Sequence, residues 1–503
     1  MERSGSTGQI GRCGSAKPVL AITMCALFLG ACANFSADGG MSVVAEQTGN
    51  ILGSDALKIR TEDESAAAQA RVTALLTKPL SAASAVQIAL LNNRGLQAAY
   101  NELGISEAEM IEASLPPAPT LSLARLTGAE LEIERQLVQN VLALLTLPRR
   151  REIAEDRFKA AQIRAVDATL RTAVDARRAY YRAVAAAQVV KFLEEARLSA
   201  DSVSELAKKL GETGALPKLD QAREHAFYAD VSGELAIARL KQRSDKEKLN
   251  RALGLWGKTM TYRLPGRLQA LPAKPRKADD IETEAVTSRV DLEVARRDIE
   301  VLAKEYGLTN ATHFIDVFEV SGVSRLERKP VTNVNYALTN PGPMLTKTET
   351  PAVEKTPRRG FNVSLQIPIY DFGEARTRRA EETYLRAVNL MIDKAVNVRA
   401  DAREAYQAYR GAYDISRYYE KEILPLREII SAQTLLKYNG MLSDLFGLLT
   451  DARARIAANV QAIQAKRDFW LAETDLNAAI TGGGGPVELN RASTAPSSDP
   501  QGH

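Results

Sequence analysis

The chain has 503 residues, of which 25% are charged and 6% aromatic, and its 66 basic and 62 acidic side chains leave a formal net charge of +4. A near balance of charge without a long basic run argues against nucleic acid as the partner. Abundant alanine and charged residues with few aromatic ones are typical of long helices rather than of an α/β enzyme.

The first 31 residues are typical of a secretion signal. Three basic residues precede the apolar run VLAITMCALFL (19–29), which has the length of a signal-peptide core and is too short to span a membrane. The run leads into Leu-Gly-Ala-Cys at 29–32, which is similar to the box of bacterial lipoproteins. We therefore expect Cys32 to be a lipid anchor. An ordinary cleaved signal followed by an incidental cysteine is the alternative.

Two halves of the chain resemble each other. ALLNNRGLQAA (89–99) matches AVTSRVDLEVA (285–295), and LNRAL (249–253) matches LNAAI (476–480). Such self-similarity indicates two copies of one structural unit. We expect an extended linker at 32–80, a first repeat at 81–255, a linker rich in Pro and Gly at 256–280, a second repeat at 281–482 and a disordered tail at 483–503. The second repeat is longer, and its extra residues near 324–355 predict a long loop.

Four segments alternate apolar and polar residues as strands do, namely 120–126, 130–138, 313–323 and 360–370. They predict β-hairpins at 119–138 and 312–370. Strands of about 9–11 residues with this pattern are typical of membrane barrels, which must close because open edges leave backbone groups unpaired in lipid. Known barrels need about eight strands or more, so several chains would share one barrel. A small soluble β-layer is the alternative.

Long helices are predicted on either side of these strands. Residues 149–210 contain neither Pro nor Gly, which predicts a helix of about 90 Å. In the second half a heptad seam favours coiled-coil packing; its members are Tyr384, Val388, Met391, Ala395, Val398, Ala402, Ala405 and Tyr409. Turns at 210–220 and 437–447 indicate helical hairpins. A cytoplasmic coiled-coil rod is the alternative on periodicity alone, but the signal segment and the strands argue against it.

Several motifs occur in the order found in one bacterial family. They are AVQIALLNNRGLQAAYNE (85–102), SLPPAPTLSL (114–123), LLTLPRRREIAE (144–155), IPIYDFGEAR (367–376), KYNGML (437–442) and DFWLAETDLNAAITG (468–482). Over about residues 81–482 the chain resembles the TolC-like outer-membrane efflux proteins. Together with the cysteine box, the motifs look most like the lipoprotein branch that includes heavy-metal and drug exporters.

The resemblance implies a mainly α fold with a membrane β-barrel, built from a tandem repeat of long coiled-coil helical hairpins and four transmembrane strands per protomer. Three protomers would form a 12-strand barrel continuous with a 12-helix periplasmic tunnel. The implied role is a passive outer-membrane conduit in a tripartite efflux system, in contact with outer-membrane lipid, a periplasmic adaptor and an inner-membrane transporter of the RND type. A periplasmic coiled-coil structural lipoprotein and the outer-membrane duct of type I protein secretion are the alternatives.

The resemblance also assigns positions to function. It places the adaptor contacts at two helical tips, in Gly214, Leu216, Gly440, Met441, Leu442 and Ser443, where glycine suits a chain that reverses direction. Family members carry acids near the second tip where this chain has Gly447 and Thr450. Asp444 and Asp451 are therefore the candidate aperture residues, with a solvated helix face as the alternative. We expect the barrel to give way to the tunnel at Pro148, Pro368, Asp371 and Gly373.

Nothing in the sequence predicts catalysis or a cofactor. The three histidines, His225, His313 and His503, are widely separated and none has a partner at metal-ligand spacing. The three cysteines all lie within the first 32 residues, so the body has no cysteine for a disulfide or a metal site. Carboxylates are plentiful, but in long helices they usually belong to solvated faces.

Overall fold

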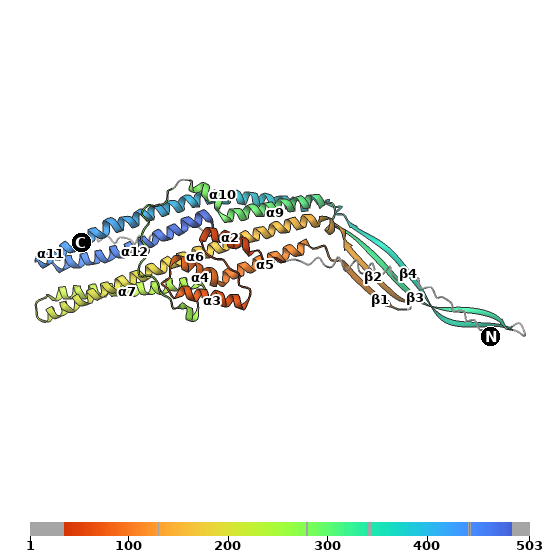
Figure 1. The fold of residues 1–503 in the computed structure, drawn as a ribbon, viewed down its shortest axis with the longest axis horizontal. Coiled ribbons are helices and arrows are strands. Elements are labelled where there is room, and N and C mark those ends of the chain that lie inside the picture. The colour runs from red at the N-terminus through yellow and green to blue at the C-terminus, as the bar shows by residue number, and fades with distance from the viewer. Residues whose placement is uncertain are drawn as a thin grey trace, which may run out of the picture.

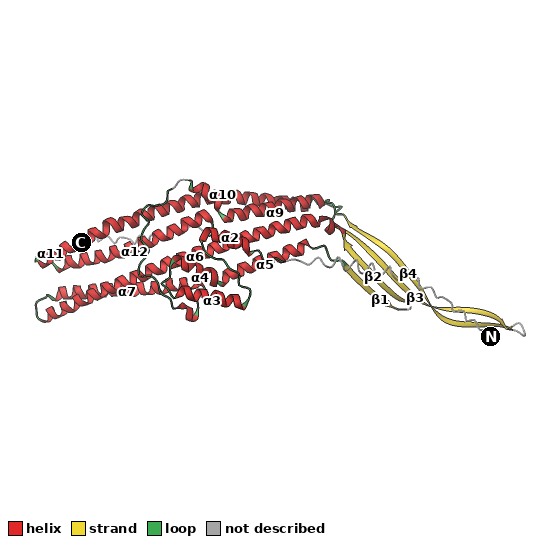
Figure 2. Ribbon diagram, viewed as in Figure 1, coloured by secondary structure: helices red, strands yellow, loops and turns green. Residues whose placement is uncertain are grey.

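The computed structural model describes residues 35–128, 130–277, 280–339, 344–440, 442 and 444–484. The molecule is strongly elongated, with a bundle of long helices at one end and strands at the other (Figure 1). Figure 2 shows that helices make up most of it and that the strands form a separate section beyond the helices. The expected mainly α fold with four strands per chain is therefore confirmed.

The two halves of the chain repeat one order of elements: two helices, a β-hairpin and a long helical hairpin. After two N-terminal helices, the first half comprises α4 (Ala82–Asn92), α5 (Arg94–Ser114), β1 (Thr120–Thr127), β2 (Leu131–Asn140), α6 (Val141–Glu212) and α7 (Lys218–Leu253). After a short 3-10 turn (Gly257–Met260), the second comprises α8 (Ile281–Ser288), α9 (Val290–Thr312), β3 (Val317–Thr339), β4 (Met344–Gln366), α10 (Glu374–Tyr418), η2 (Tyr419–Ile423), α11 (Leu424–Asn439) and α12 (Leu445–Thr481).

The segment before the first repeat is not the extended linker that the sequence suggested. It contains α2 (Met41–Leu52) and α3 (Glu62–Leu76). Thr61 caps α3 by accepting a hydrogen bond from the Glu64 amide, and the Glu64 carboxylate accepts one from the Thr61 amide in return. Val44 and Val72 are fully buried against the long helices. Each helix buries only two apolar side chains, Met41 and Val44 in α2 and Ala68 and Val72 in α3, which is too few to give a clear helical pattern in the sequence.

The helix α6 runs without a break through 72 residues, a length of about 110 Å. The heptad seam predicted in the second half is confirmed, because Val398, Ala402, Ala405 and Tyr409 are buried on α10 and the other members of the seam are half-buried. Alanine at these positions lets α10 approach α9 and α12 closely.

The long helix after the second β-hairpin is interrupted, whereas its counterpart α6 in the first half is continuous. A π-helical turn over Tyr419–Ile423 separates α10 from α11, and Pro425 follows at the start of α11. Proline cannot donate the hydrogen bond that a continuing α-helix requires, and the π-turn, a form that occurs as a bulge inside α-helices, lies directly before it.

The strands form one antiparallel sheet in the order β1-β2-β3-β4. Residues 324–355 are not the long loop that the sequence suggested, because β3 and β4 each run for 23 residues and pair from Val317↔Gln366 to Thr339↔Met344. Three prolines lie within these two strands. Pro351 and Pro357 lie on the edge strand β4, and Pro330 lies just beyond Arg328, the last β3 residue paired with β2. Each therefore occupies a strand with a free edge, where proline is tolerated.

The two repeats pack against each other through aromatic and charged contacts. Tyr181 of α6 stacks on Trp470 of α12 with ring centroids 5.4 Å apart. Close by, Arg178 Nε lies 2.6 Å from an Asp475 carboxylate oxygen. These contacts hold α6 and α12 side by side.

Candidate functional site

The sheet has two chemically different faces. Because alternate residues of a strand point to opposite sides, the register places Leu365 beside Phe318, Val363 beside Val320, and Phe361 beside Gly322 on one side. We call this side the apolar face; its large apolar members are Leu121, Leu123, Leu131, Ile133, Leu137, Phe318, Val320, Leu326, Phe361, Val363 and Leu365. Many of these side chains are exposed in the single chain.

The opposite side, which we call the polar face, carries a network of ion pairs and hydrogen bonds. Its members are Glu132, Glu134, Gln136, Glu319, Ser321, Arg325, Glu327, Lys329, Arg358 and Ser364. Arg325 of β3 lies 2.7 Å from Glu132 and 3.0 Å from Glu134 of β2. Gln136 donates a hydrogen bond of 3.2 Å to the Ser321 hydroxyl. A sheet that is apolar on one face and ion-paired on the other suits a boundary between lipid and water.

Both outer strands of this sheet have a free edge. β1 pairs only with β2 and β4 only with β3 among the residues described. An edge strand presents unpaired N–H and C=O groups, which a hydrocarbon environment does not tolerate. The sheet is therefore incomplete as a membrane-spanning unit until β1 and β4 find partners.

The change from sheet to helix takes different forms in the two repeats. After β4, Asp371 accepts hydrogen bonds from the Gly373 and Ala375 amides, and Gly373 has φ 77° at the start of α10. A Cβ at Gly373 would lie 2.0 Å from the His313 carbonyl oxygen, so this position requires glycine. Pro368 lies between the end of β4 and this turn.

In the first repeat the transition takes place at Asn140, whose side chain accepts a hydrogen bond of 2.8 Å from the Ala143 amide and so caps α6. Pro148, which the sequence suggested for this role, lies inside α6, about two turns beyond its start. The stretch without Pro or Gly predicted a helix only from residue 149, so the cap at Asn140 was missed.

The two helical tips differ in their backbone. Between α6 and α7, Gly214 has φ 75° and the Ala215 and Leu216 amides both donate to the Leu210 carbonyl. At the second tip Gly440 has φ −82°, a value that other residues also adopt, so the backbone there does not require glycine. The Leu442 amide donates to the Lys437 carbonyl, and the Leu442 side chain is 81% exposed. Met441 and Ser443 lie outside the described residues, as does Cys32.

The two candidate aperture acids have different surroundings. Asp444 is the N-cap of α12, where its carboxylate accepts a hydrogen bond of 3.0 Å from the Gly447 amide. Asp451 is only 8% exposed, and its Oδ1 has no hydrogen-bond partner among the described residues. The structure thus gives Asp444 a clear role in the local fold, and it places Asp451 inside the helical packing of the single chain.

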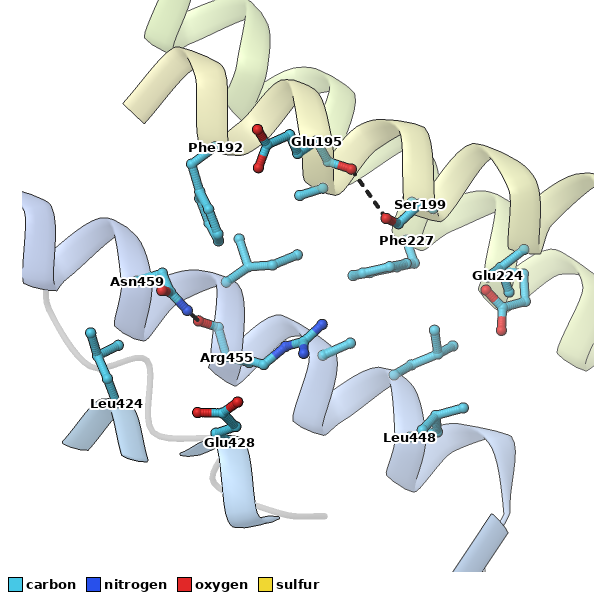
Figure 3. Close-up of a pocket in the computed structure, with 16 residues that line it drawn as sticks. Phe192, Glu195, Ser199, Glu224, Phe227, Leu424, Glu428, Leu448, Arg455 and Asn459 are labelled. Atoms are coloured by element: carbon cyan, nitrogen blue, oxygen red, sulfur yellow. Dashed lines mark hydrogen bonds between the residues drawn. The ribbon is translucent and has the colours of Figure 1, made fainter. Parts of the chain in front are cut away.

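A cavity of about 650 Å³ lies between the two helical hairpins near their tips. Figure 3 shows Phe192 and Phe227 on one side and Arg455 with Glu428 on the other. Glu224 also lines it, is 1% exposed, and both of its carboxylate oxygens are without a partner among the described residues. Burial raises the pKa of Glu224. Sequence reasoning missed this residue, because one Glu in a charged helix carries no signal.

The described residues hold no group of three or more His, Cys, Asp or Glu placed to bind a metal ion. His225 pairs with the Ser204 hydroxyl through Nδ1 at 2.7 Å, a contact between neighbouring helices. Among all the residues that the structure describes, no helix is both long and apolar enough to cross a membrane.

The arrangement matches that of solved channel structures. Over 80% of this chain and 92% of the other, it superposes on CusC, a transmembrane channel, with a TM-score of 0.63 at 15% identity. It is similar to the CmeC outer-membrane channel of Campylobacter jejuni with a TM-score of 0.63 at 16% identity, over 80% of this chain and 86% of that one. It is also similar to the outer-membrane protein VceC of Vibrio cholerae, with a TM-score of 0.62 at 15% identity, over 82% of this chain and 96% of that one.

The chain has the fold of an outer-membrane channel protein. A scan of protein-family models and a search of curated proteins both find no match. An identity of 15–16% shows a common fold, but it does not assign a role to any single residue of this chain.

Proposed function

We propose that this chain is the outer-membrane channel of a tripartite efflux system. Three copies would join their sheets into one 12-strand barrel, with the helices continuing into the periplasm as a tunnel. The channel is a passive duct, and an inner-membrane transporter of the RND type supplies the energy through a periplasmic adaptor. No chemical step is part of this function.

The observation that carries the proposal is the four-stranded sheet with an apolar face, a polar face and two free edges. A barrel places apolar side chains toward lipid and polar ones toward a wet interior. Closure through copies of the same chain satisfies both edges at once, since β1 of one protomer can pair with β4 of the next.

The helical part supports the same assembly. No residue of α11 is buried, although Leu426, Ile429 and Leu436 project from it. Exposed apolar residues also occur on α6 and α7, for example Leu206 and Ile237. A helix in water requires a partner for such residues, and the neighbouring protomers of a tunnel provide it.

The remaining assignments follow from the channel role. We propose that Cys32 carries the lipid anchor in the outer membrane and that the tips at Gly214–Leu216 and 440–443 meet the adaptor. Asp444 and Asp451 stay candidates for the aperture. Leu442 supports the tip assignment, because a leucine that is 81% exposed at the end of a hairpin suits a docking contact.

Conductance in a planar lipid bilayer tests the proposal. The full-length protein, purified in detergent, should run as a trimer that dissociates on heating and should form long-lived ion-conducting pores. Replacing Leu365 by Lys should reduce the number of pores, which shows that the pores come from this protein and not from a contaminant. A monomeric protein that stays in water after removal of the lipid, and that forms no pores, would instead indicate a structural lipoprotein.

A further inference from the structure

The apolar face of the sheet carries cations at one end only. Beginning at the helical bundle, its first rows contain Phe318 with Leu365 and Val320 with Val363. Farther from the bundle, three successive rows contain basic residues, which we call the cationic rows: Arg125, Arg135, Arg328, Lys355 and Arg359. Apolar residues such as Leu123, Ile133 and Leu326 stand between them.

These cations differ from the basic residues of the polar face. There Arg325 pairs with Glu132 and Glu134, and Arg358 pairs with Glu327 at 3.4 Å. Among the described residues no such ion pair is formed by a member of the cationic rows, and those three rows contain no Asp or Glu on their side of the sheet. The Nε atom of Arg328 is buried without a hydrogen-bond partner. Between the bundle and the pair Arg328–Lys355, the sheet thus places its acids on one face and leaves five cations on the other.

The position of the rows along the strands fits a membrane interface. With a rise of ~3.3 Å per residue and a tilt of about 40°, Lys355 lies about 25 Å from Leu365 along the barrel axis, and Arg359 about 15 Å. The lipid-facing band of such barrels is about 25 Å tall. Exposed Ile369 and Tyr370 extend the apolar surface on the bundle side, so the cationic rows fall at the outer end of the band. Arginine and lysine there reach the headgroups with their long side chains.

We propose that the cationic rows bind the anionic phosphate headgroups of lipids in the outer leaflet. This inference rests on the proposed membrane channel, since only a membrane brings lipid to this face. Arginine forms bidentate, charge-assisted hydrogen bonds to phosphate. A ring of such contacts from each protomer would fix the depth of the barrel in the membrane and surround it with bound lipid.

Native mass spectrometry of the detergent-solubilised full-length protein tests the proposal. Diphosphoryl lipid A is the probe, and the same lipid with both phosphates removed is the comparison. The wild-type protein should prefer the phosphorylated lipid, and inorganic phosphate at millimolar concentration should not displace it, which separates a lipid site from a site for free phosphate.

Two neighbouring arginines on β4 provide the matched variants. Arg359 lies on the apolar face and Arg358 on the polar face, so Arg359→Gln and Arg358→Gln remove the same charge one residue apart. Arg359→Gln should weaken lipid binding roughly fivefold. The double variant with Arg135→Gln and Arg359→Gln should weaken it by about a further factor of five. Arg358→Gln should leave binding unchanged, and Arg359→Lys should retain most of it.

Equal binding of the two lipids by the wild-type protein would overturn the proposal without any variant. So would equal losses in Arg359→Gln and Arg358→Gln. Pore formation by the same samples distinguishes failure of the lipid site from failure of the channel role. A conducting channel with no preference for the phosphorylated lipid contradicts the lipid site alone, whereas a protein that forms no pores contradicts the channel role.

Discussion

Leu365 of β4 lies directly opposite Phe318 of β3 on the apolar face of the sheet. The preceding residue, Ser364, lies opposite Glu319 on the polar face. In the proposed barrel, one step along the strand therefore changes the environment from lipid to the wet interior.

This alternation gives the first prediction. Leu365→Lys should impair assembly in the membrane, because a lysine on the lipid-facing side of a barrel costs up to about 2–4 kcal/mol at the bilayer midplane. Ser364→Lys should be tolerated, because the new cation would face Glu319 on the polar face. The yield of heat-dissociable trimer in the outer-membrane fraction measures both, and equal yields for the two variants would mean that the faces are assigned wrongly.

The turn before α10 gives the second prediction. Gly373→Ala should destabilise the protein by about 2 kcal/mol or more, because φ is 77° and the new Cβ would lie 2.0 Å from the His313 carbonyl oxygen. Gly440→Ala is the control, since its φ is −82° and the nearest atom would be 3.4 Å away. Thermal unfolding followed by circular dichroism should show a clear loss for the first variant and little change for the second.

The cap of α12 gives the third prediction. Asp444→Ala should cost about 0.5–2 kcal/mol of local stability and increase hydrogen exchange in the first turn of α12, because the Gly447 amide loses its acceptor. Asp444→Asn keeps a capping side chain but removes the charge, so it should preserve protection. If Asp444→Asn changed the cation selectivity of the pore, Asp444 would act at the aperture as well as in the cap.

The buried carboxyl between the helical hairpins gives the fourth prediction. Burial raises the pKa of Glu224 above its ordinary value of 4.5, so the folded state holds its proton to higher pH than the unfolded state does. Stability should therefore fall as the pH rises from about 4.5 through the raised pKa. Glu224→Gln should remove this loss and raise the unfolding temperature at neutral pH.

The same substitution at Glu195 is the matched control, because that residue lines the same cavity but is exposed. Unfolding temperatures measured from pH 4 to pH 8 should converge for wild type and Glu224→Gln at the acid end and separate at neutral pH. Parallel curves over the whole range would contradict the assigned cause.

Much of this architecture could be predicted because its signals are long or strictly periodic. The stretch without Pro or Gly within α6 and the seam ending at Tyr409 on α10 are examples, and so is the alternation around Leu365. The fold of β3 and β4 beyond Arg328 could not be predicted, because proline is usually read as a loop signal. Only the register shows that Pro330, Pro351 and Pro357 occupy strands with a free edge.

The candidate site could be predicted less completely. Asp371 and Gly373, which turn the chain into α10, stand out in the sequence. Asn140 does not, because the apolar run that follows it already forms the first turns of α6. Glu224 becomes notable only when α6, α7 and α12 pack around it. Contacts between distant segments decide such cases, and no local pattern encodes them.

Electron cryo-microscopy of the full-length protein in detergent tests the central claim most directly. The account predicts three copies around one axis, with β1 of each protomer hydrogen-bonded to β4 of the next and the apolar face directed outward. A particle in which β1 and β4 keep free edges, or in which the face bearing Leu365 points inward, would contradict it.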